Sequence, residues 1–260
     1  MSLALQSEVE HVLSEAERTG ASTLVLSHRG LKVVPAEVAK LSHLRTLLLN
    51  DNGLLMPPTE VVHLAQLEVL SLERNELTLL PMQISSLSAL RFLNLSYNNL
   101  ACLPPTFGSL TNLRELWLVA MELTMFPNEL CNLHLLQKLS LAKNSLPSLP
   151  DDVANLSNLN WLSLAQNHIR ELPPLFSKLE ALSVLILEDN IICDFPLLLT
   201  DMRALQHLNL RRNKIASLPL ALADALEKSG TLKKIDIRGN TLDEELPLTP
   251  PWSGMNQIHF

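Results

Sequence analysis

A 23-residue period is the feature of this sequence that most constrains its fold. Copies of the unit L-x-x-L-x-L-x-x-N-x-L-x-x-L-P-x-x-φ-x-x-L-x-x, with φ apolar, begin every 23 residues from Ala21 to Leu205, and a tenth copy begins 27 residues later at Leu232. The copy starting at Leu67 shows the pattern most clearly. A fixed period of this length is typical of a solenoid, in which stacked units bury faces that one unit alone cannot bury.

The spacing of the apolar residues predicts how each unit, numbered here from its first residue, is arranged. The alternation of leucines at positions four and six predicts a short strand with both leucines on its inner side. Positions three, five, seven and eight should then face outward. The apolar residue after the proline and the later leucine should form the opposite wall of the core.

Position nine is an asparagine in eight of the ten units, at Asn52, Asn75, Asn98, Asn144, Asn167, Asn190, Asn213 and Asn240. Its side-chain amide can satisfy backbone groups of adjacent turns that would otherwise lack partners. Arg29 and Met121 are the two departures from this pattern.

The unit resembles the intracellular leucine-rich repeats of the Ras-suppressor and LAP types, which share the L-P-x-x-φ-x-x-L half. The resemblance covers about residues 21–250. It implies the α/β fold of a leucine-rich-repeat solenoid, a curved horseshoe arc. A parallel sheet of about ten strands would form its concave face, with short helical or 3-10 segments on its convex face. It also implies protein binding without catalysis.

The ends of the chain should cover the exposed faces of the solenoid. We predict an N-terminal capping helix within residues 1–20, ten repeats over 21–246, and a C-terminal cap and tail over 247–260. In the helix, Ser7 and Glu10 fit a capping box, Val9, Leu13 and Ala16 form an apolar stripe, and Gly20 fits the helix end. Two further predictions are a helical turn within Leu220–Gly230 and Trp252 packed over the last turn. Residues 253–260 are expected to be a frayed tail.

Composition and motifs argue against several classes of protein. The net charge of −7 argues against nucleic-acid binding. The sequence contains no phosphate-binding glycine loop, G-x-S-x-G or H-E-x-x-H motif, and its scattered histidines and three cysteines have no metal-ligand spacing. We therefore expect no enzyme, no cofactor, no metal and no membrane insertion. The N-terminus does not resemble a signal peptide, which favours the cytoplasm or the nucleus.

The outward strand positions are where the fold leaves the residue type open, so candidate binding residues were sought there. Two tryptophans lie in these columns, together with other aromatic and aliphatic residues. The alternative is that these side chains pack only on one another and stiffen the sheet. The predicted partner-binding residues of the concave face are Phe92, Tyr97, Trp117, Val119, Met121, Trp161, Ile186, Arg211, Arg212, Lys234 and Arg238.

The four basic residues of this set would favour a protein partner with an acidic segment. These features predict a non-catalytic scaffold or adaptor for intracellular signalling. Two alternatives stay open from the sequence. One is a recognition or regulatory subunit of an enzyme complex such as a ligase or phosphatase, and the other is self-association through the concave face.

Overall fold

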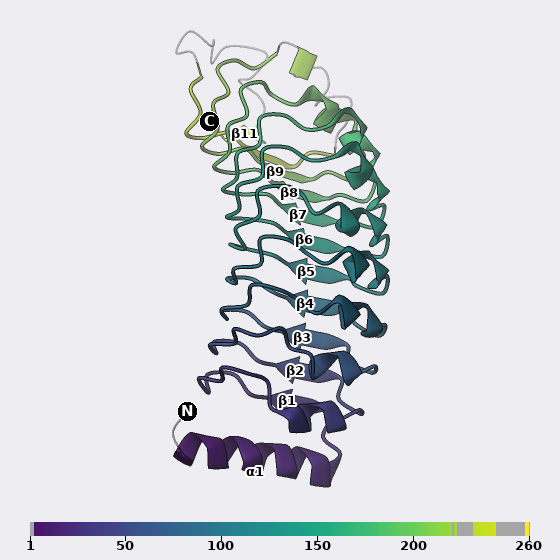
Figure 1. Ribbon diagram of the computed structural model, residues 1–260. Coiled ribbons are helices and arrows are strands. Elements are labelled where there is room, and N and C mark those ends of the chain that lie inside the picture. The colour runs from purple at the N-terminus through teal and green to yellow at the C-terminus, as the bar shows by residue number, and fades with distance from the viewer. Residues whose placement is uncertain (1–2, 220, 223–230, 243–257, 260) are drawn as a thin grey trace. The chain divides into compact units, whose positions relative to one another are not determined.

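The structure is a computed structural model that describes residues 3–219, 221–222, 231–242 and 258–259. The chain forms two compact parts, residues 1–123 and 124–260. They are called here the N-terminal body and the C-terminal body, and each is described by itself. Both consist of stacked repeats whose strands follow one another in chain order (Figure 1).

The N-terminal body begins with helix α1 (Leu3–Thr19) and continues with five strands that alternate with 3-10 helices. The strands are β1 (Thr23–Val25), β2 (Thr46–Leu48), β3 (Val69–Ser71), β4 (Phe92–Asn94) and β5 (Glu115–Trp117). The 3-10 helices are η1 (Ala36–Lys40), η2 (Val61–His63), η3 (Met82–Ser86) and η4 (Pro105–Ser109). All strand pairs are parallel and place position three of one repeat beside position three of the next, as at Thr46, Val69 and Phe92.

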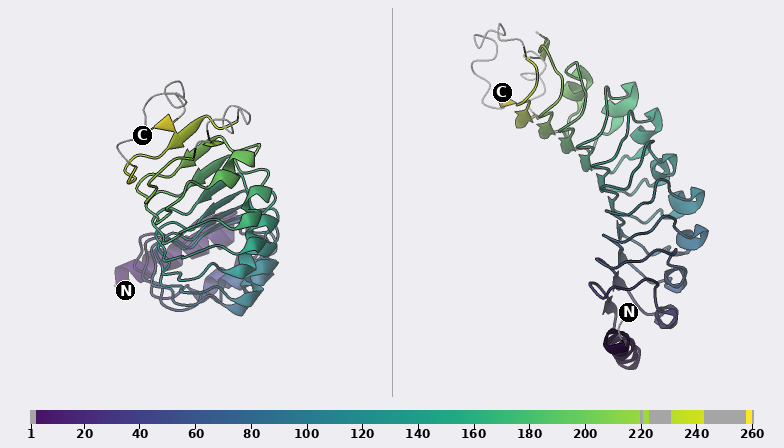
Figure 2. Two further views of the ribbon diagram at one scale, coloured as in Figure 1. Left: turned by 90° about the horizontal axis from the view of Figure 1, so that it is seen from above. Right: turned by 60° about the vertical axis from the view of Figure 1, so that its left-hand side comes forward.

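The C-terminal body repeats this arrangement with six strands among its described residues. The strands are β6 (Lys138–Ser140), β7 (Trp161–Ser163), β8 (Val184–Ile186), β9 (His207–Asn209), β10 (Lys234–Asp236) and β11 (Ile258–His259). The 3-10 helices are η5 (Asn128–Asn132), η6 (Asp151–Asn155), η7 (Pro174–Lys178) and η8 (Leu197–Asp201). In each body the strands lie on one side and the 3-10 helices on the other (Figure 2). The predicted α/β repeat fold with a parallel sheet is confirmed, and each of the ten predicted strands is present.

The repeated apolar residues form the core, as the spacing predicts. In the repeat that starts at Leu67, the side chains of Leu67, Leu70, Leu72 and Leu77 are fully buried. Ile84 forms the opposite wall from η3 and is also fully buried. Prolines precede most of the 3-10 helices because proline fixes φ near the value that these turns require and donates no hydrogen bond.

The ninth-position asparagines form the predicted ladder between neighbouring turns. Asn75 Nδ2 donates to the carbonyls of Leu49 and Leu72 at 3.0 and 2.8 Å, and its Oδ1 accepts from the Leu54 N–H at 3.1 Å. Asn167 and Asn213 repeat the same three contacts in the C-terminal body. Each asparagine therefore satisfies backbone groups of its own repeat and of the preceding one.

Position eight of every repeat has a positive φ, between 51° and 71°. Most of these residues are not glycine, although such backbone angles are uncommon for other residues. The turn is held by the position-eight N–H, which donates to the position-seven carbonyl of the next repeat, as from Asp51 to Glu73 at 2.9 Å. In the two repeats without the asparagine, the residue after position nine also has a positive φ, at Gly30 (59°) and Glu122 (62°).

Helix α1 covers the first repeat with Val9, Leu13 and Ala16, which are at most 5% exposed. Gly20 ends it with a φ of 64°. The predicted capping box is wrong, because α1 begins at Leu3 and Ser7 therefore lies inside the helix. Arg29 donates to Glu8 of α1 at 2.5 Å. Helix α1 packs on this side of the first repeat, so an arginine that reaches the helix suits the position.

The C-terminal prediction is wrong in one respect. Residues 258 and 259 form β11, which pairs in parallel with β10, and Ile258 is 8% exposed. An apolar side chain that can extend the sheet and bury itself is the physical reason that these residues are ordered. Trp252, most of Leu220–Gly230 and the rest of the predicted tail lie outside the described residues.

Candidate functional site

The outward strand positions form a surface on the strand side of each body, called here the sheet face. In the N-terminal body, Phe92, Trp117 and Val119 lie on it and are half-buried. Phe92 pairs with Glu115 and Trp117 pairs with Asn94, so the two aromatic residues are diagonal neighbours on β4 and β5. With strands about 4.8 Å apart, their Cα atoms are separated by roughly 8 Å. The structure thus brings these two predicted residues together.

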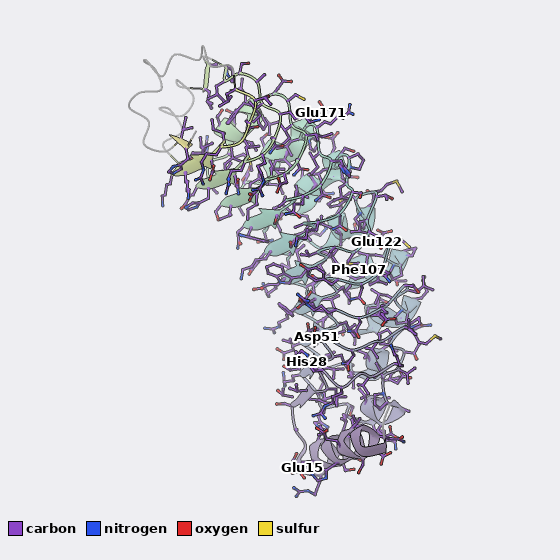
Figure 3. All side chains as sticks on the ribbon, turned by 90° about the vertical axis from the view of Figure 1, so that its left-hand side faces the viewer. Glu15, His28, Asp51, Phe107, Glu122 and Glu171 are labelled. Atoms are coloured by element: carbon purple, nitrogen blue, oxygen red, sulfur yellow. The ribbon has the colours of Figure 1, made fainter. Side chains whose placement is uncertain are left out.

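Tyr97 belongs to a ladder of position-eight side chains on the same body. His28 Nε2 lies 3.7 Å from an Asp51 carboxylate oxygen, and the two residues lie on neighbouring turns (Figure 3). The other Asp51 oxygen lies 3.9 Å from Arg74 Nε. The guanidinium of Arg74 then lies 4.9 Å from the centre of the Tyr97 ring, an arrangement typical of a cation–π interaction.

Sequence reasoning missed the polar residues that position this cluster. Arg74 Nε also lies 3.5 Å from a Glu73 carboxylate oxygen, and Asn94 Nδ2 donates to the other Glu73 oxygen at 2.9 Å. Asn94 Oδ1 accepts from the Ser96 N–H at 3.0 Å. Their positions, five, seven and eight, were the available signal, because the same columns of neighbouring repeats combine carboxylates, amides and a guanidinium.

Met121 does not belong to the sheet face, and this prediction is wrong. Its side chain is fully buried. Position nine points into the stack, where the asparagines of other repeats bond to backbone groups. A methionine at this position therefore fills the interior and offers no surface to a partner.

In the C-terminal body, Trp161 and Ile186 lie on the sheet face and are half-buried. Trp161 pairs with Val184, and Ile186 pairs with Ser163. Beside them the face has a hollow of about 270 Å³ over β8, β9 and β10. Its main lining side chains are Val184, Ile186, His207, Asn209, Lys234 and Asp236. Lys234, which is exposed, is one of the residues that line this hollow.

The three predicted arginines of this body have carboxylate partners. Arg212 donates to both oxygens of Asp189 at 2.5 and 2.6 Å, and its Nη2 lies 2.9 Å from Glu188. Arg238 donates to both oxygens of Asp236 at 2.9 and 2.5 Å.

Arg211 lies 3.8 Å from Glu188. The hydrogen bond from Arg212 is the main reason that the pKa of Asp189 lies below its ordinary value, and the hydrogen bond from Arg238 has the same effect on the pKa of Asp236. The charge of these three arginines is thus largely neutralised, because side chains two residues away or one repeat away carry the opposite charge.

The cysteines differ in their surroundings. Cys131 is buried, and its burial, followed by the nearby Asp152 carboxylate, raises the pKa of its thiol to about 11. Cys102 and Cys193 are exposed. Across the described residues, no group of three or more His, Cys, Asp or Glu side chains is placed to hold a metal ion.

The most exposed large apolar side chains lie mainly away from the predicted site. Val25 is the sheet-face residue among them, at 48% exposure. Several others occupy the loops between the strands and the 3-10 helices of the N-terminal body. The aromatics of the sheet face are half-buried, while a second apolar surface is more open to solvent.

The comparison with protein families matches a leucine-rich repeat region over residues 25–141 and 126–248. The chain belongs to the leucine-rich repeat family. None of the curated proteins matches it significantly.

Solved leucine-rich repeat structures are similar to the chain. One is a leucine-rich repeat protein of Leptospira interrogans, with a TM-score of 0.75 and 29% identity, covering 84% of this chain and 61% of its own. Another is the leucine-rich repeat ectodomain of the plant membrane receptor kinase GASSHO1/SCHENGEN3 from Arabidopsis thaliana, in complex with CASPARIAN STRIP INTEGRITY FACTOR 2. It has a TM-score of 0.73 and 32% identity, covering 91% of this chain and 29% of its own. The repeats of this chain thus span less than two thirds of either protein.

A helix long and apolar enough to cross a membrane is not found among the described residues.

Proposed function

We propose that this leucine-rich repeat chain is a non-catalytic scaffold or adaptor that binds a protein partner on its sheet face. The observation that carries the proposal is the placement of Phe92 and Trp117 as diagonal neighbours on β4 and β5. The repeat needs leucines in its interior but no aromatic residue at positions three and five. Aromatic side chains are common anchors of protein interfaces.

The hollow of the C-terminal body supports the same proposal. Val184, Ile186 and Leu208 are among its lining residues, and Lys234 adds a cation to the lining. An apolar depression with a few polar groups is the usual form of a site that takes a side chain of a partner. The plant receptor ectodomain, a similar stack of repeats, was solved in complex with CASPARIAN STRIP INTEGRITY FACTOR 2, which supports a binding role for this chain.

The paired arginines reduce the case for a strongly acidic partner. Arg211, Arg212 and Arg238 already have carboxylates beside them. A partner would have to compete with these contacts, so we propose that apolar burial, with Lys234 adding one cation, provides most of the affinity.

The test is affinity purification followed by mass spectrometry, with the wild-type chain and the double variant Trp117→Ala/Trp161→Ala as baits. We expect one or more partners to be retained by the wild type and lost from the variant. Val25→Ala is the matched control, since Val25 is exposed on the same face at the far end of the row of strands. Equal retention by all three baits, at equal melting temperature, would place the binding site elsewhere.

The resemblance to Ras-suppressor and LAP-type repeats leads us to propose a role in intracellular signalling. A fluorescently tagged chain is then expected in the cytoplasm or the nucleus. Secretion of the tagged chain into the medium would contradict this part of the proposal without affecting the binding role.

A further inference from the structure

Apolar side chains form a row at position thirteen of the N-terminal body, on the loops that lead from the strands to the 3-10 helices. Val33, Met56 and Leu79 are 57%, 62% and 57% exposed, and Cys102 follows them in the same column. Leu55 and Met82, which are 48% and 50% exposed, flank the row. These six residues are called here the loop ridge.

Hydrogen bonds between successive loops keep the loop ridge in register. The position-ten N–H of one repeat donates to the position-eleven carbonyl of the preceding repeat, as from Gly53 to Leu31 at 2.9 Å and from Glu76 to Leu54 at 3.0 Å. Equivalent side chains therefore follow one another at about the strand spacing of 4.8 Å. Several half-exposed aliphatic side chains in a row amount to a few hundred Å², the size at which an apolar patch indicates an interaction site.

The fold does not require apolar residues at this position. In the C-terminal body the column continues with Met125, which is 75% exposed, and is then polar. Its remaining members are Ser148, Glu171, Asp194 and Ser217, and all four are exposed. The same loop thus forms with polar side chains as well. The apolar residues at position thirteen of the N-terminal body therefore need an explanation other than the fold.

We propose that the loop ridge docks an amphipathic helix of a partner protein that carries basic residues beside its apolar stripe. One turn of an α-helix rises 5.4 Å, which is close to the spacing of the ridge, so apolar residues three or four apart can each meet one repeat. In an extended strand, successive residues of one face lie 6.6–6.8 Å apart, so their side chains would not match the spacing of the repeats. Methionine side chains adapt readily to the apolar face of such helices.

The charges beside the ridge favour a basic helix. At Val33 the ridge borders a groove of about 340 Å³ between α1 and the loop after β1, and Glu10 and Glu37 line this groove. Lys32 also lines it, but its Nζ lies 3.4 Å from a Glu76 carboxylate oxygen. To reach Glu76 the lysine crosses Gly53, where a Cβ would be 2.4 Å from Nζ. The cation is thus neutralised, and the two glutamates leave the groove acidic.

The area of the ridge favours a single helix over a second copy of the chain. A stable dimer usually needs about 800 Å² from each partner, and the ridge supplies a few hundred. This docking surface is separate from the sheet face, so it goes beyond the function proposed above and does not depend on it.

The test uses the full chain and a fluorescein-labelled helical peptide of about 18 residues, with leucines three and four apart and lysines elsewhere. Binding is measured by fluorescence anisotropy. The variant is Met56→Glu/Leu79→Glu. The matched control is Ser148→Glu/Ser217→Glu, which adds the same charge at the same repeat position in the C-terminal body. A second peptide has glutamates in place of the lysines.

We expect the lysine peptide to bind the wild type, to lose at least tenfold in affinity for Met56→Glu/Leu79→Glu, and to keep its affinity for the control within twofold. The glutamate peptide should bind more weakly than the lysine peptide. Equal affinity of the lysine peptide for the variant and the control would overturn the proposal, as would no binding to the wild type. Self-association of the wild type in sedimentation, abolished by Met56→Glu/Leu79→Glu, would assign the ridge to a second copy instead.

Discussion

Replacing Asn75 by alanine tests how the asparagine ladder holds the repeats together. The asparagine is 7% exposed and bonds to backbone groups of two repeats. The carbonyls of Leu49 and Leu72 each keep a second asparagine donor, from Asn52 and Asn98 respectively, both at 2.9 Å. Among the described residues, the acceptor of the Leu54 N–H is the Asn75 oxygen alone. Alanine therefore leaves one buried donor without a partner.

The expected cost follows from these contacts. Loss of the two amide bonds should cost about 1 kcal/mol each, and the orphaned N–H of Leu54 about 1–3 kcal/mol more. We therefore expect Asn75→Ala to lower the free energy of unfolding by about 3–5 kcal/mol. Asn75→Met copies the residue at position 121 and should cost less, because the larger side chain fills the space that alanine leaves empty.

The measurement is urea denaturation together with amide hydrogen exchange at Leu54. Asn99→Ala is the control, since this exposed asparagine lies one position further along the next repeat and its loss should cost less than about 0.5 kcal/mol. The reasoning is refuted if Asn75→Ala costs less than about 1 kcal/mol, or if the protection of the Leu54 amide is unchanged.

Three further predictions concern charge, thiols and the contrast between the core and the loop ridge. Arg212→Gln should raise the pKa of Asp189 towards its ordinary value of 3.8, measured by NMR titration of the carboxyl carbon. Because the folded pKa of Asp189 is lowered, its pair with Arg212 stabilises the wild type above pH 3.8. This stabilisation is lost as pH falls through the lowered pKa. The difference in unfolding free energy between wild type and variant should therefore disappear in acid. At pH 8, iodoacetamide should modify the exposed Cys102 and Cys193, as measured by mass spectrometry. Cys131 should react only after unfolding, because it is buried and the pKa of its thiol is raised to about 11. Leu93→Ala should lower the free energy of unfolding by about 2–5 kcal/mol, whereas Leu79→Ala on the loop ridge should change it by less than about 1 kcal/mol in the same urea titration.

The core and the strands could be predicted from the sequence because each repeat has the same pattern of residues. The leucines at positions four and six, the proline and the asparagine recur in one register, so an error in one repeat is corrected by its neighbours. Where a repeat lacks such support, the prediction was wrong. Met121 was placed on the surface although its column points inward, and Ile258 was placed in a tail although it completes a strand.

The candidate site was predicted less completely, since it depends on side chains from neighbouring repeats. The sequence shows that Arg212 carries a positive charge. It does not show that Asp189, which lies 23 residues earlier, pairs with Arg212 and neutralises that charge. The loop ridge was missed because only the strand columns were read for surface residues. Reading position thirteen in the same way would have revealed the run of Val33, Met56 and Leu79 before the structure was known.

The most direct test of the account is site-specific photo-crosslinking on the sheet face. A benzoylphenylalanine at Val119, beside Trp117, reports any protein that contacts this surface in cells, and the same residue at the exposed Thr111, between η4 and β5, serves as the reference. We expect a discrete adduct from position 119 that the Trp117→Ala background abolishes, and no such adduct from position 111. Absence of an adduct at 119, or an equal adduct at both positions, would contradict the proposal that the sheet face binds the partner.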